Sequence, residues 1–288
     1  MKTSMIALLV SMLFVTGVFA QTTAAQEQDA ALLEKFFQTV PKTTVDSAMI
    51  RSALFFLNTP YVASTLEVND DEKLVINERE LDCTTFVENC LALARTLQQA
   101  HPNSAGFEQE LQKIRYRGGV IDGYTSRLHY ISDWIFDNEA NGIIKDMTCE
   151  LGGRKLKPDV HFMSQNYHKY THLANNPENV QRIQAIEQKI NARENGYCYI
   201  PKNEIQNKQS LIKSGDIVCF VTSIKGLDLS HLGIAYWQNG RLTFIHASST
   251  AKKVIINPES LSDFCDGIKT NKGIMVLRPL SVKLALNL

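Results

Sequence analysis

Apolar residues are spaced three and four positions apart through much of the first two thirds of the chain, and they gather in short runs in the last quarter. The first spacing is typical of amphipathic helices and the second of short strands. We predict helices over residues 30–39, 44–58, 83–99, 105–115, 127–138 and 177–194. We predict strands over residues 217–221, 231–237, 242–246, 254–256 and 273–277. Because the helices come first and an antiparallel sheet last, the expected fold class is α+β.

The helix over residues 83–99 is the clearest element, and it begins with a cysteine. Cys83 opens its apolar stripe, and Asp82 is a good N-cap immediately before it. Two histidines, His231 and His246, follow on predicted strands, and the Asn239-Gly240 hairpin signal makes these strands neighbours. A thiol at a helix start with a histidine about 150 residues later is typical of papain-like cysteine hydrolases.

Such a set of residues predicts amide hydrolysis through a thioester. The helix start and a His231 imidazolium would both lower the pKa of the Cys83 thiol, while the Asp82 carboxylate would oppose them. His246 would hold the second nitrogen of His231, and backbone N–H groups at the helix start would stabilise the oxyanion. Each residue alone also fits a structural role: Cys83 in the core, His231 at a strand edge and His246 buried. The N-cap, the hairpin and the order of the elements together favour catalysis.

The first twenty residues have the pattern of a secretory signal peptide. Lys2 precedes an apolar run from Met5 to Val15, and Val18-Phe19-Ala20 is a small-residue cleavage site. The run is too short to span a membrane. We therefore expect a secreted or periplasmic protein that does not insert stably into a membrane. Its mature part, residues 21–288, is interpreted as one papain-like domain in which residues 100–212 form an insertion or substrate-binding region.

The balance of charges argues against one class of partner. The chain has 30 basic and 30 acidic residues without a basic block, which gives no reason to expect nucleic acid as a partner.

Export permits disulfides among the six cysteines. Cys83 and Cys90 would lie about 10 Å apart along one helix, too far to bridge. Cys90 and Cys219 resemble buried hydrophobic residues, and the pairing of the other cysteines stays open.

No pattern for a metal or another cofactor is present. His168 and His172 stand at i, i+4, with His161 before them, but no H-E-x-x-H pattern occurs. We interpret these histidines as part of a solvated helix face and expect neither a metal nor a cofactor. The glycine pairs lack the rest of a phosphate-binding loop, and no G-x-S-x-G serine-hydrolase motif occurs.

The segment 124–137 is a second candidate binding region. Arg127, His129 and Tyr130 could supply carboxylate pairing and sugar stacking to a ligand. The alternative is an amphipathic helix that packs on the core, and the apolar spacing favours it equally. We retain all three residues as candidates for substrate binding.

Three blocks of sequence resemble the NlpC/P60 superfamily of cell-wall cysteine amidases and peptidases. These blocks are Thr59-Pro60-Tyr61-Val62, Leu81-Asp82-Cys83-Thr84-Thr85-Phe86-Val87, and the group formed by Lys213-Ser214-Gly215-Asp216-Ile217-Val218, Ser230-His231-Leu232-Gly233-Ile234 and Phe244-Ile245-His246-Ala247. The resemblance implies a papain-like core in which the nucleophile helix packs on an antiparallel sheet, with a large mixed insertion between helix and sheet. Thr84 stands where the family usually has serine, and the loop between Tyr61 and Cys83 is longer than typical.

The resemblance also implies roles for individual residues. Cys83 would be the nucleophile, His231 the base and His246 the orienting residue. It implies that Tyr61 lies near the oxyanion. The residues that it places on the peptide side of the cleft are Asp82, Thr84 and Ser230.

The long middle section and the segments 80–85 and 124–130 resemble a narrower branch of this superfamily, which was formerly a domain of unknown function. That branch is associated with N-acetylmuramoyl-L-alanine amidase activity on muropeptides. It implies an exported cysteine hydrolase that acts on this bond in peptidoglycan fragments, and we expect a monomer. Two alternatives stay open. One is an endopeptidase that cuts the stem peptide after D-glutamate, and the other is a catalytically inactive muropeptide-binding module.

Overall fold

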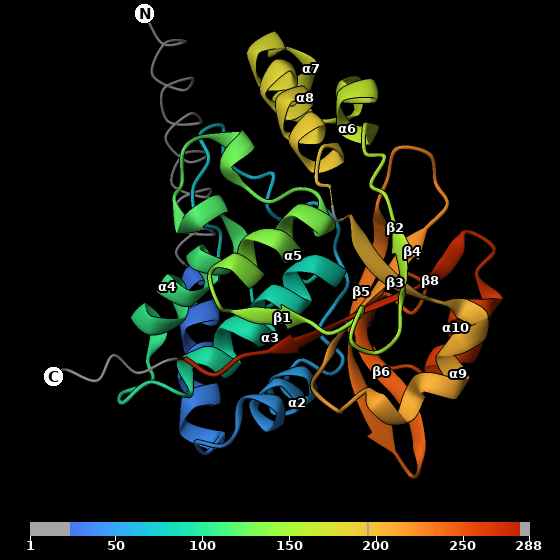
Figure 1. The fold of residues 1–288 in the computed structure, drawn as a ribbon. Helices are drawn as coiled ribbons and strands as arrows, with labels where there is room; N and C mark the ends of the chain where they lie inside the picture. The colour runs from blue at the N-terminus through green and yellow to red at the C-terminus, as the bar shows by residue number, and fades with distance from the viewer. Residues whose placement is uncertain (1–23, 195, 283–288) are drawn as a thin grey trace, which may run out of the picture.

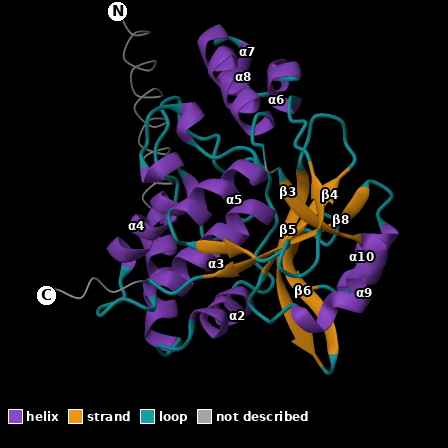
Figure 2. Cartoon of the chain, viewed as in Figure 1, coloured by secondary structure: helices purple, strands orange, loops and turns teal. Residues whose placement is uncertain are grey.

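Helices and strands are segregated into a helical side and a sheet (Figures 1 and 2). The computed structural model describes residues 24–194 and 196–282, so the predicted signal peptide lies outside the described residues. Residues 24–39 are helical. The other helices are α2 (Val45–Phe55), α3 (Cys83–Thr96), α4 (Ser104–Arg115), α5 (Ile131–Ala140), α6 (Phe162–Gln165), α7 (Thr171–Ala174), α8 (Pro177–Asn191), α9 (Ile205–Lys208) and α10 (Leu261–Gly267). None of the described helices is both long and apolar enough to cross a membrane.

Within the described residues, eight strands form one antiparallel sheet. They are β1 (Ile144–Asp146), β2 (Arg154–Leu156), β3 (Tyr197–Pro201), β4 (Ile217–Thr222), β5 (Leu229–Gln238), β6 (Arg241–Ser248), β7 (Lys253–Ile256) and β8 (Asn271–Pro279). The strand order is β2-β3-β8-β4-β5-β6-β7, and β1 pairs with β8 beside this path. Segregated helices and an antiparallel sheet confirm the α+β class.

The predicted hairpin is present between β5 and β6. Gln238 pairs with Arg241 across the turn, and Asn239 and Gly240 have φ angles of 52° and 77°. A two-residue hairpin turn of this kind needs positive φ at both positions, which asparagine and glycine adopt most easily. This turn sets the register that places His231 and His246 on neighbouring strands.

Helix α3 is the central element of the core. Every residue from Thr85 to Thr96 is buried, and the helix contacts α2, α4, β5 and β6. Side chains such as Leu232, Ile234 and Ile245 cover it from one face of the sheet. The opposite face packs against α9 and α10, which lie on the far side of the sheet from α3 in Figure 1. Helix α3 is therefore held against β5 by packing along most of its length.

The middle section differs from the prediction in three ways. Strands β1, β2 and β3 were not expected, although they join the same sheet as β4–β8. Helix α5 begins only at Ile131, so residues 127–130 precede it rather than form its first turn. The interpretation of residues 161–172 as one solvated helix face is wrong, because α6, a 3-10 turn and α7 divide the segment. His172 instead stacks on Tyr124, with ring centroids 4.9 Å apart.

A disulfide between Cys149 and Cys198 ties the turn after β1 to β3. The two cysteines are 49 residues apart in sequence, so the bond should restrict the unfolded chain and stabilise the protein by about 4 kcal/mol. We expect the Cys149→Ala/Cys198→Ala variant to lose free energy of unfolding of about this size in urea titrations. Reductant should lower the stability of the wild type to that of the variant and leave the variant unchanged. Equal stabilities without reductant would contradict the prediction.

Candidate active site

Cys83 is the first residue of α3, and a capping box fixes its position. One carboxylate oxygen of Asp82, Oδ1, accepts the backbone N–H groups of Thr84 and Thr85 at 3.0 and 2.8 Å. In return, the Thr85 hydroxyl accepts the backbone N–H of Asp82 at 2.9 Å. Because these reciprocal bonds satisfy the open end of the helix, the half-buried thiol of Cys83 projects from a rigid backbone.

The thiol lies in an environment that favours its neutral form. Burial and, as the second cause, the nearby Asp82 carboxylate raise the pKa of Cys83 to about 12. The backbone N–H of Leu232, the Thr84 side chain and the thiol's own backbone N–H oppose the rise. The N–H groups at the helix start therefore act in the expected direction, but the net change in the pKa of this thiol is opposite to the expectation. Desolvation outweighs the few N–H groups at the helix start.

Tyr61 completes this side of the site. Its segment forms bridges to Leu81 and its backbone N–H donates to the Lys252 carbonyl at 2.9 Å. Burial raises the pKa of Tyr61, and the charges of Cys83 and Asp82 raise it in addition. The Tyr61 hydroxyl therefore stays protonated at neutral pH and lies close enough to Cys83 to sense its charge. The structure thus brings together Tyr61, Asp82, Cys83 and Thr84.

The two histidines form a hydrogen-bonded pair on β5 and β6. Nε2 of His231 and Nδ1 of His246 are 2.7 Å apart. Ser230 is an extra residue in β5, because His231 lies opposite Phe220 while Leu229 lies opposite Val221. The bulge leaves the Ser230 side chain exposed, and bulges commonly re-aim side chains beside functional sites.

Burial also keeps both histidines neutral. It lowers the pKa of His231 to about 4. The pKa of His246 falls to about 3, mainly by burial and further through the charge of His231. At pH 7 the pair is therefore two neutral rings that share one proton between the facing nitrogens.

Leu232 connects the thiol to the histidine pair. Its backbone N–H faces the thiol of Cys83, and His231 precedes it on β5. None of the hydrogen bonds found among residues 24–194 and 196–282 joins the thiol to the His231 ring. Catalytic hydrogen bonds are often long before substrate binds. The arrangement therefore places a free thiol and two neutral imidazole rings on adjoining elements.

Two adjoining cavities open beside the start of α3. One has a volume of about 200 Å³ and is lined by Asp82, Thr84, Glu88, Arg115, Arg127 and His129, among others. The other, of about 320 Å³, shares Ser64, Glu67 and His129 with the first. Its remaining lining includes Tyr124, Tyr130, Lys169 and Tyr170. Together they form a cleft that runs from the start of α3 toward α6 and α7, with charged groups at one end and aromatic rings at the other.

Arg127, His129 and Tyr130 line this cleft, but their polar groups contact the protein itself. The Arg127 guanidinium lies 2.6 Å from the Glu67 carboxylate and 3.5 Å from that of Glu72. His129 Nε2 is 2.9 Å from the Tyr124 carbonyl oxygen. The Tyr130 hydroxyl donates to Glu187 at 2.7 Å and accepts the backbone N–H of Met163 at 2.9 Å. These contacts order the wall of the cleft.

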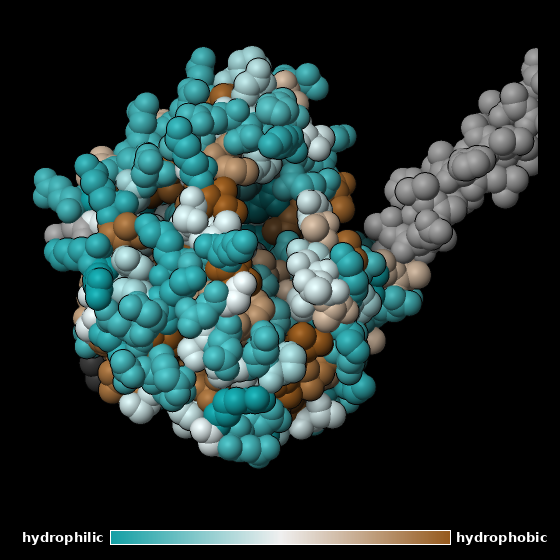
Figure 3. Space-filling model, turned by 90° about the vertical axis from the view of Figure 1, so that its right-hand side faces the viewer, coloured by the Kyte–Doolittle hydropathy of each residue, from teal (hydrophilic) through white to brown (hydrophobic). Residues whose placement is uncertain are grey.

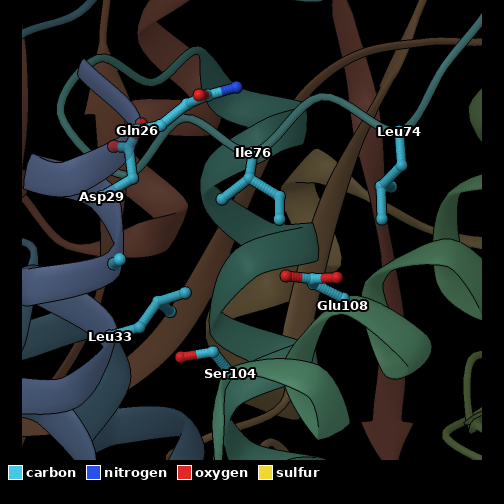
Figure 4. Close-up of a pocket in the computed structure, with 8 residues that line it drawn as sticks. Gln26, Asp29, Leu33, Leu74, Ile76, Ser104 and Glu108 are labelled. Carbon is cyan, nitrogen blue, oxygen red and sulfur yellow. The ribbon is translucent and has the colours of Figure 1, made fainter. Parts of the chain in front are cut away.

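Other cleft residues were missed from the sequence. Glu67, Lys169 and Tyr170 belong to segments without clear periodicity, so no local pattern singles them out. A separate cavity of about 290 Å³ lies between the helix of residues 24–39, the segment 74–76 and the start of α4 (Figure 4). Asp29, Leu33 and Glu108 line it, and no candidate residue does.

Figure 3 shows one side of the molecule with hydrophilic residues over most of it and small groups of hydrophobic residues around a hollow. Within the described part of the chain, no three His, Cys, Asp or Glu side chains converge as metal ligands would.

The chain is similar to proteins of one family. A family model described as N-acetylmuramoyl-L-alanine amidase-like matches residues 51–274. A crystal structure of an N-acetylmuramoyl-L-alanine amidase from Bacteroides uniformis is 40% identical, covers 82% of this chain and 99% of that chain, and has a TM-score of 0.78. A Bacteroides fragilis protein with a proposed xylanase activity is 43% identical over 79% of this chain and 98% of its own, with a TM-score of 0.75.

A more distant structure, from Legionella pneumophila, is 25% identical, covers 90% of this chain and 96% of that chain, and has a TM-score of 0.69. No curated protein matches the chain. The similarity therefore extends over most of the described residues and over nearly the whole length of each solved structure.

Proposed function

The chain belongs to the N-acetylmuramoyl-L-alanine amidase-like family, and on this basis we propose that it is an exported cysteine hydrolase of peptidoglycan fragments. The scissile bond is the amide between the lactyl group of muramic acid and L-alanine. The observation that carries the cysteine mechanism is the His231–His246 hydrogen bond of 2.7 Å, on the strand whose Leu232 N–H faces Cys83. The packing of α3 on β5 and β6 supports a papain-like NlpC/P60 core.

The proposed reaction begins with two neutral partners. His231 accepts the thiol proton as Cys83 attacks the lactyl carbonyl carbon, because neither group is charged at pH 7. The Cys83 backbone N–H and the Tyr61 hydroxyl donate to the oxyanion. The amine of L-alanine leaves with a proton from His231, and a thioester remains. Water, deprotonated by His231, then hydrolyses the thioester and restores the thiol.

The cleft supports a substrate with two chemically different parts. Aromatic rings such as Tyr124 and Tyr170 suit the apolar face of a sugar, and Asp82, Thr84 and Arg127 suit the polar groups of a peptide. We further propose a monomer outside the cytoplasm, with residues 1–20 removed as a signal peptide.

Mass analysis of products from defined muropeptides tests the proposal. The amidase should release the intact stem peptide and the free sugar. An endopeptidase would leave L-alanine and D-glutamate on the sugar, which gives different masses. Cys83→Ala protein, purified in the same way, is the control for contaminating hydrolases. Intact substrate with the wild type would support the inactive muropeptide-binding module instead.

Alkylation of Cys83 reports the protonation state that the mechanism assumes. Because burial raises the pKa of this thiol to about 12, little thiolate is present at pH 7, where a free cysteine with a pKa near 8.5 already has a few per cent. We expect iodoacetamide to label Cys83 more slowly than free cysteine at pH 7, and the rate to keep rising above pH 9. Mass spectrometry of the labelled peptide would measure it. Rapid labelling below pH 7 would instead indicate a preformed thiolate–imidazolium pair.

A further inference from the structure

The outer nitrogen of His246 has an unusual position. Nδ1 of this ring is bonded to His231, whereas Nε2 is fully buried and has no hydrogen-bond partner within the usual distance among the described residues. His246 itself is only 3% exposed. A buried ring nitrogen without a partner costs free energy unless a neighbouring group satisfies it. The group that faces this nitrogen is the Asn257 side chain, which raises the pKa of His246 against the effect of burial.

We propose that Asn257 is a positioning residue whose side-chain oxygen accepts the Nε2–H of His246 and thereby fixes the tautomer in which His231 can act as a base. The inference rests on the proposed function of Cys83 and His231. It adds a fourth residue to the set formed by the thiol and the two histidines.

The backbone holds Asn257 next to His246. Asn257 follows β7, where Ile255 lies opposite His246, so Asn257 is the diagonal neighbour of His246 on the same face of the sheet. Its N–H donates to the Phe244 carbonyl at 2.8 Å, and its carbonyl accepts the Thr243 hydroxyl at 2.7 Å. Asn257 is 4% exposed. The bond to Phe244 continues the pairing of β6 with β7 and sets the position of Asn257.

The amide group of Asn257 is oriented as the proposal requires. Its Nδ2 donates to the Glu259 carbonyl at 3.2 Å, which leaves the oxygen Oδ1 as the atom available to His246. A carbonyl oxygen can only accept a hydrogen bond. Asn257 therefore favours the form of His246 that carries its proton on Nε2.

The position of that proton decides what His231 can do. If His246 carries its proton on Nε2, its Nδ1 can only accept, so the proton between the two rings belongs to Nε2 of His231. Nδ1 of neutral His231 is then free to take the thiol proton. In the other tautomer His246 donates to His231, whose Nδ1 carries a proton and cannot act as a base. Asn257 thus acts on catalysis through His246.

The surroundings of the pair leave few other groups that could set this tautomer. Phe220, Phe244 and Phe264, from β4, β6 and α10, pack around the two rings at centroid distances between 4.5 and 6.4 Å. Among the described residues, the only titratable group that shifts the pKa of His246 is His231. Phenylalanine rings offer no strong acceptor, so Asn257 is the polar side chain left to act on Nε2.

Kinetics of Asn257→Leu compared with Thr243→Val separate this role from a structural one. Thr243→Val removes a bond to the backbone of the same segment and leaves the Asn257 side chain in place. We expect kcat of Asn257→Leu to fall about 10- to 100-fold with little change in KM, and kcat of Thr243→Val to stay within about threefold of the wild type. Equal losses in both variants, at equal thermal stability, would overturn the proposal.

Ring-nitrogen NMR of histidine-labelled protein gives a readout independent of activity. His246 should show the Nε2–H tautomer in the wild type, with His246→Gln used for assignment, and a mixture of tautomers in Asn257→Leu. Unchanged ring shifts in Asn257→Leu would overturn the inference. If the tautomer changes in Asn257→Leu but the wild type cleaves no muropeptide, the inference about Asn257 is supported and the proposed function is contradicted.

Asn257→Asp keeps the shape of the side chain, so this variant should fold even if Asn257→Leu does not. A carboxylate at this position favours the charged form of the pair, so the pKa of the histidines should rise. Because activity requires a neutral His231, the acid limb of the kcat/KM profile should move to higher pH. An acid limb at the wild-type pH, with intact folding, would contradict the proposed contact.

Discussion

Replacement of Cys83 by alanine is expected to lower kcat for muramoyl–L-alanine hydrolysis by at least about 10⁴-fold, because no thioester can form. Serine at this position should be nearly as inactive, since His231 has a low pKa and is a weak base for a hydroxyl. Product release from a defined muropeptide, followed by mass spectrometry, measures both variants. Binding of the same muropeptide to the alanine variant should persist, because the cleft walls are unchanged.

Cys219→Ala is the matched control. Cys219 is also a free thiol, but it is wholly buried in β4 and contacts the core rather than the cleft. Its replacement should cost some stability through the cavity that it leaves and should preserve kcat. Loss of activity in Cys219→Ala but not in Cys83→Ala would overturn the assignment of the nucleophile.

His231 and Cys83 should act as one unit. His231→Ala alone should reduce kcat by about as much as Cys83→Ala, and the double variant should be little worse than either, as effects within such a set are not additive. His246→Ala should have a smaller effect, because in the proposed mechanism this residue orients the base without touching the substrate. Additive losses in the double variant would indicate that the two residues serve separate steps.

The elements that carry these residues could be predicted because their signals are local. The capped start of α3 shows in Asp82 and the apolar stripe that follows it, and the β5–β6 turn shows in Asn239-Gly240. Strands β1 and β2 could not be predicted in the same way. Each has three residues without alternation, and each forms only by pairing with a strand at least 40 residues away in sequence. Long-range pairing leaves no periodic pattern in such short segments.

The electrostatics of the candidate site could not be predicted either. Sequence shows that Cys83 stands at a helix start, which alone favours a thiolate. It does not show that the thiol is buried in the folded protein, beside a strand about 150 residues later in the sequence, or that this burial raises its pKa. Asn257 was missed for a similar reason, because a single asparagine after a strand is more typical of a turn. The contact with His246 depends on the register of β6 and β7.

Breaking a buried ion pair beneath the cleft should destabilise the protein about as much as loss of the disulfide. Glu88 of α3 and Arg115 of α4 lie 2.7 Å apart, with side chains 3% and 2% exposed. Glu88→Ala leaves the Arg115 guanidinium buried without its carboxylate, so the free energy of unfolding should fall by about 3–5 kcal/mol. The Val75 carbonyl, which also accepts from Arg115 at 2.6 Å, cannot neutralise the positive charge.

Urea unfolding of three variants would separate the charge effect from the loss of packing. Glu178→Ala breaks the exposed Arg182–Glu178 pair, whose side chains are 52% and 72% exposed, and should cost no more than about 1 kcal/mol. Glu88→Leu/Arg115→Met removes both buried charges and should be more stable than Glu88→Ala, because no unpaired charge remains. A double variant less stable than Glu88→Ala would show that the pair itself stabilises the fold. Glu88 and Arg115 also line the cavity at the start of α3. The value of kcat measured on the double variant would therefore show whether their charges also contribute to catalysis.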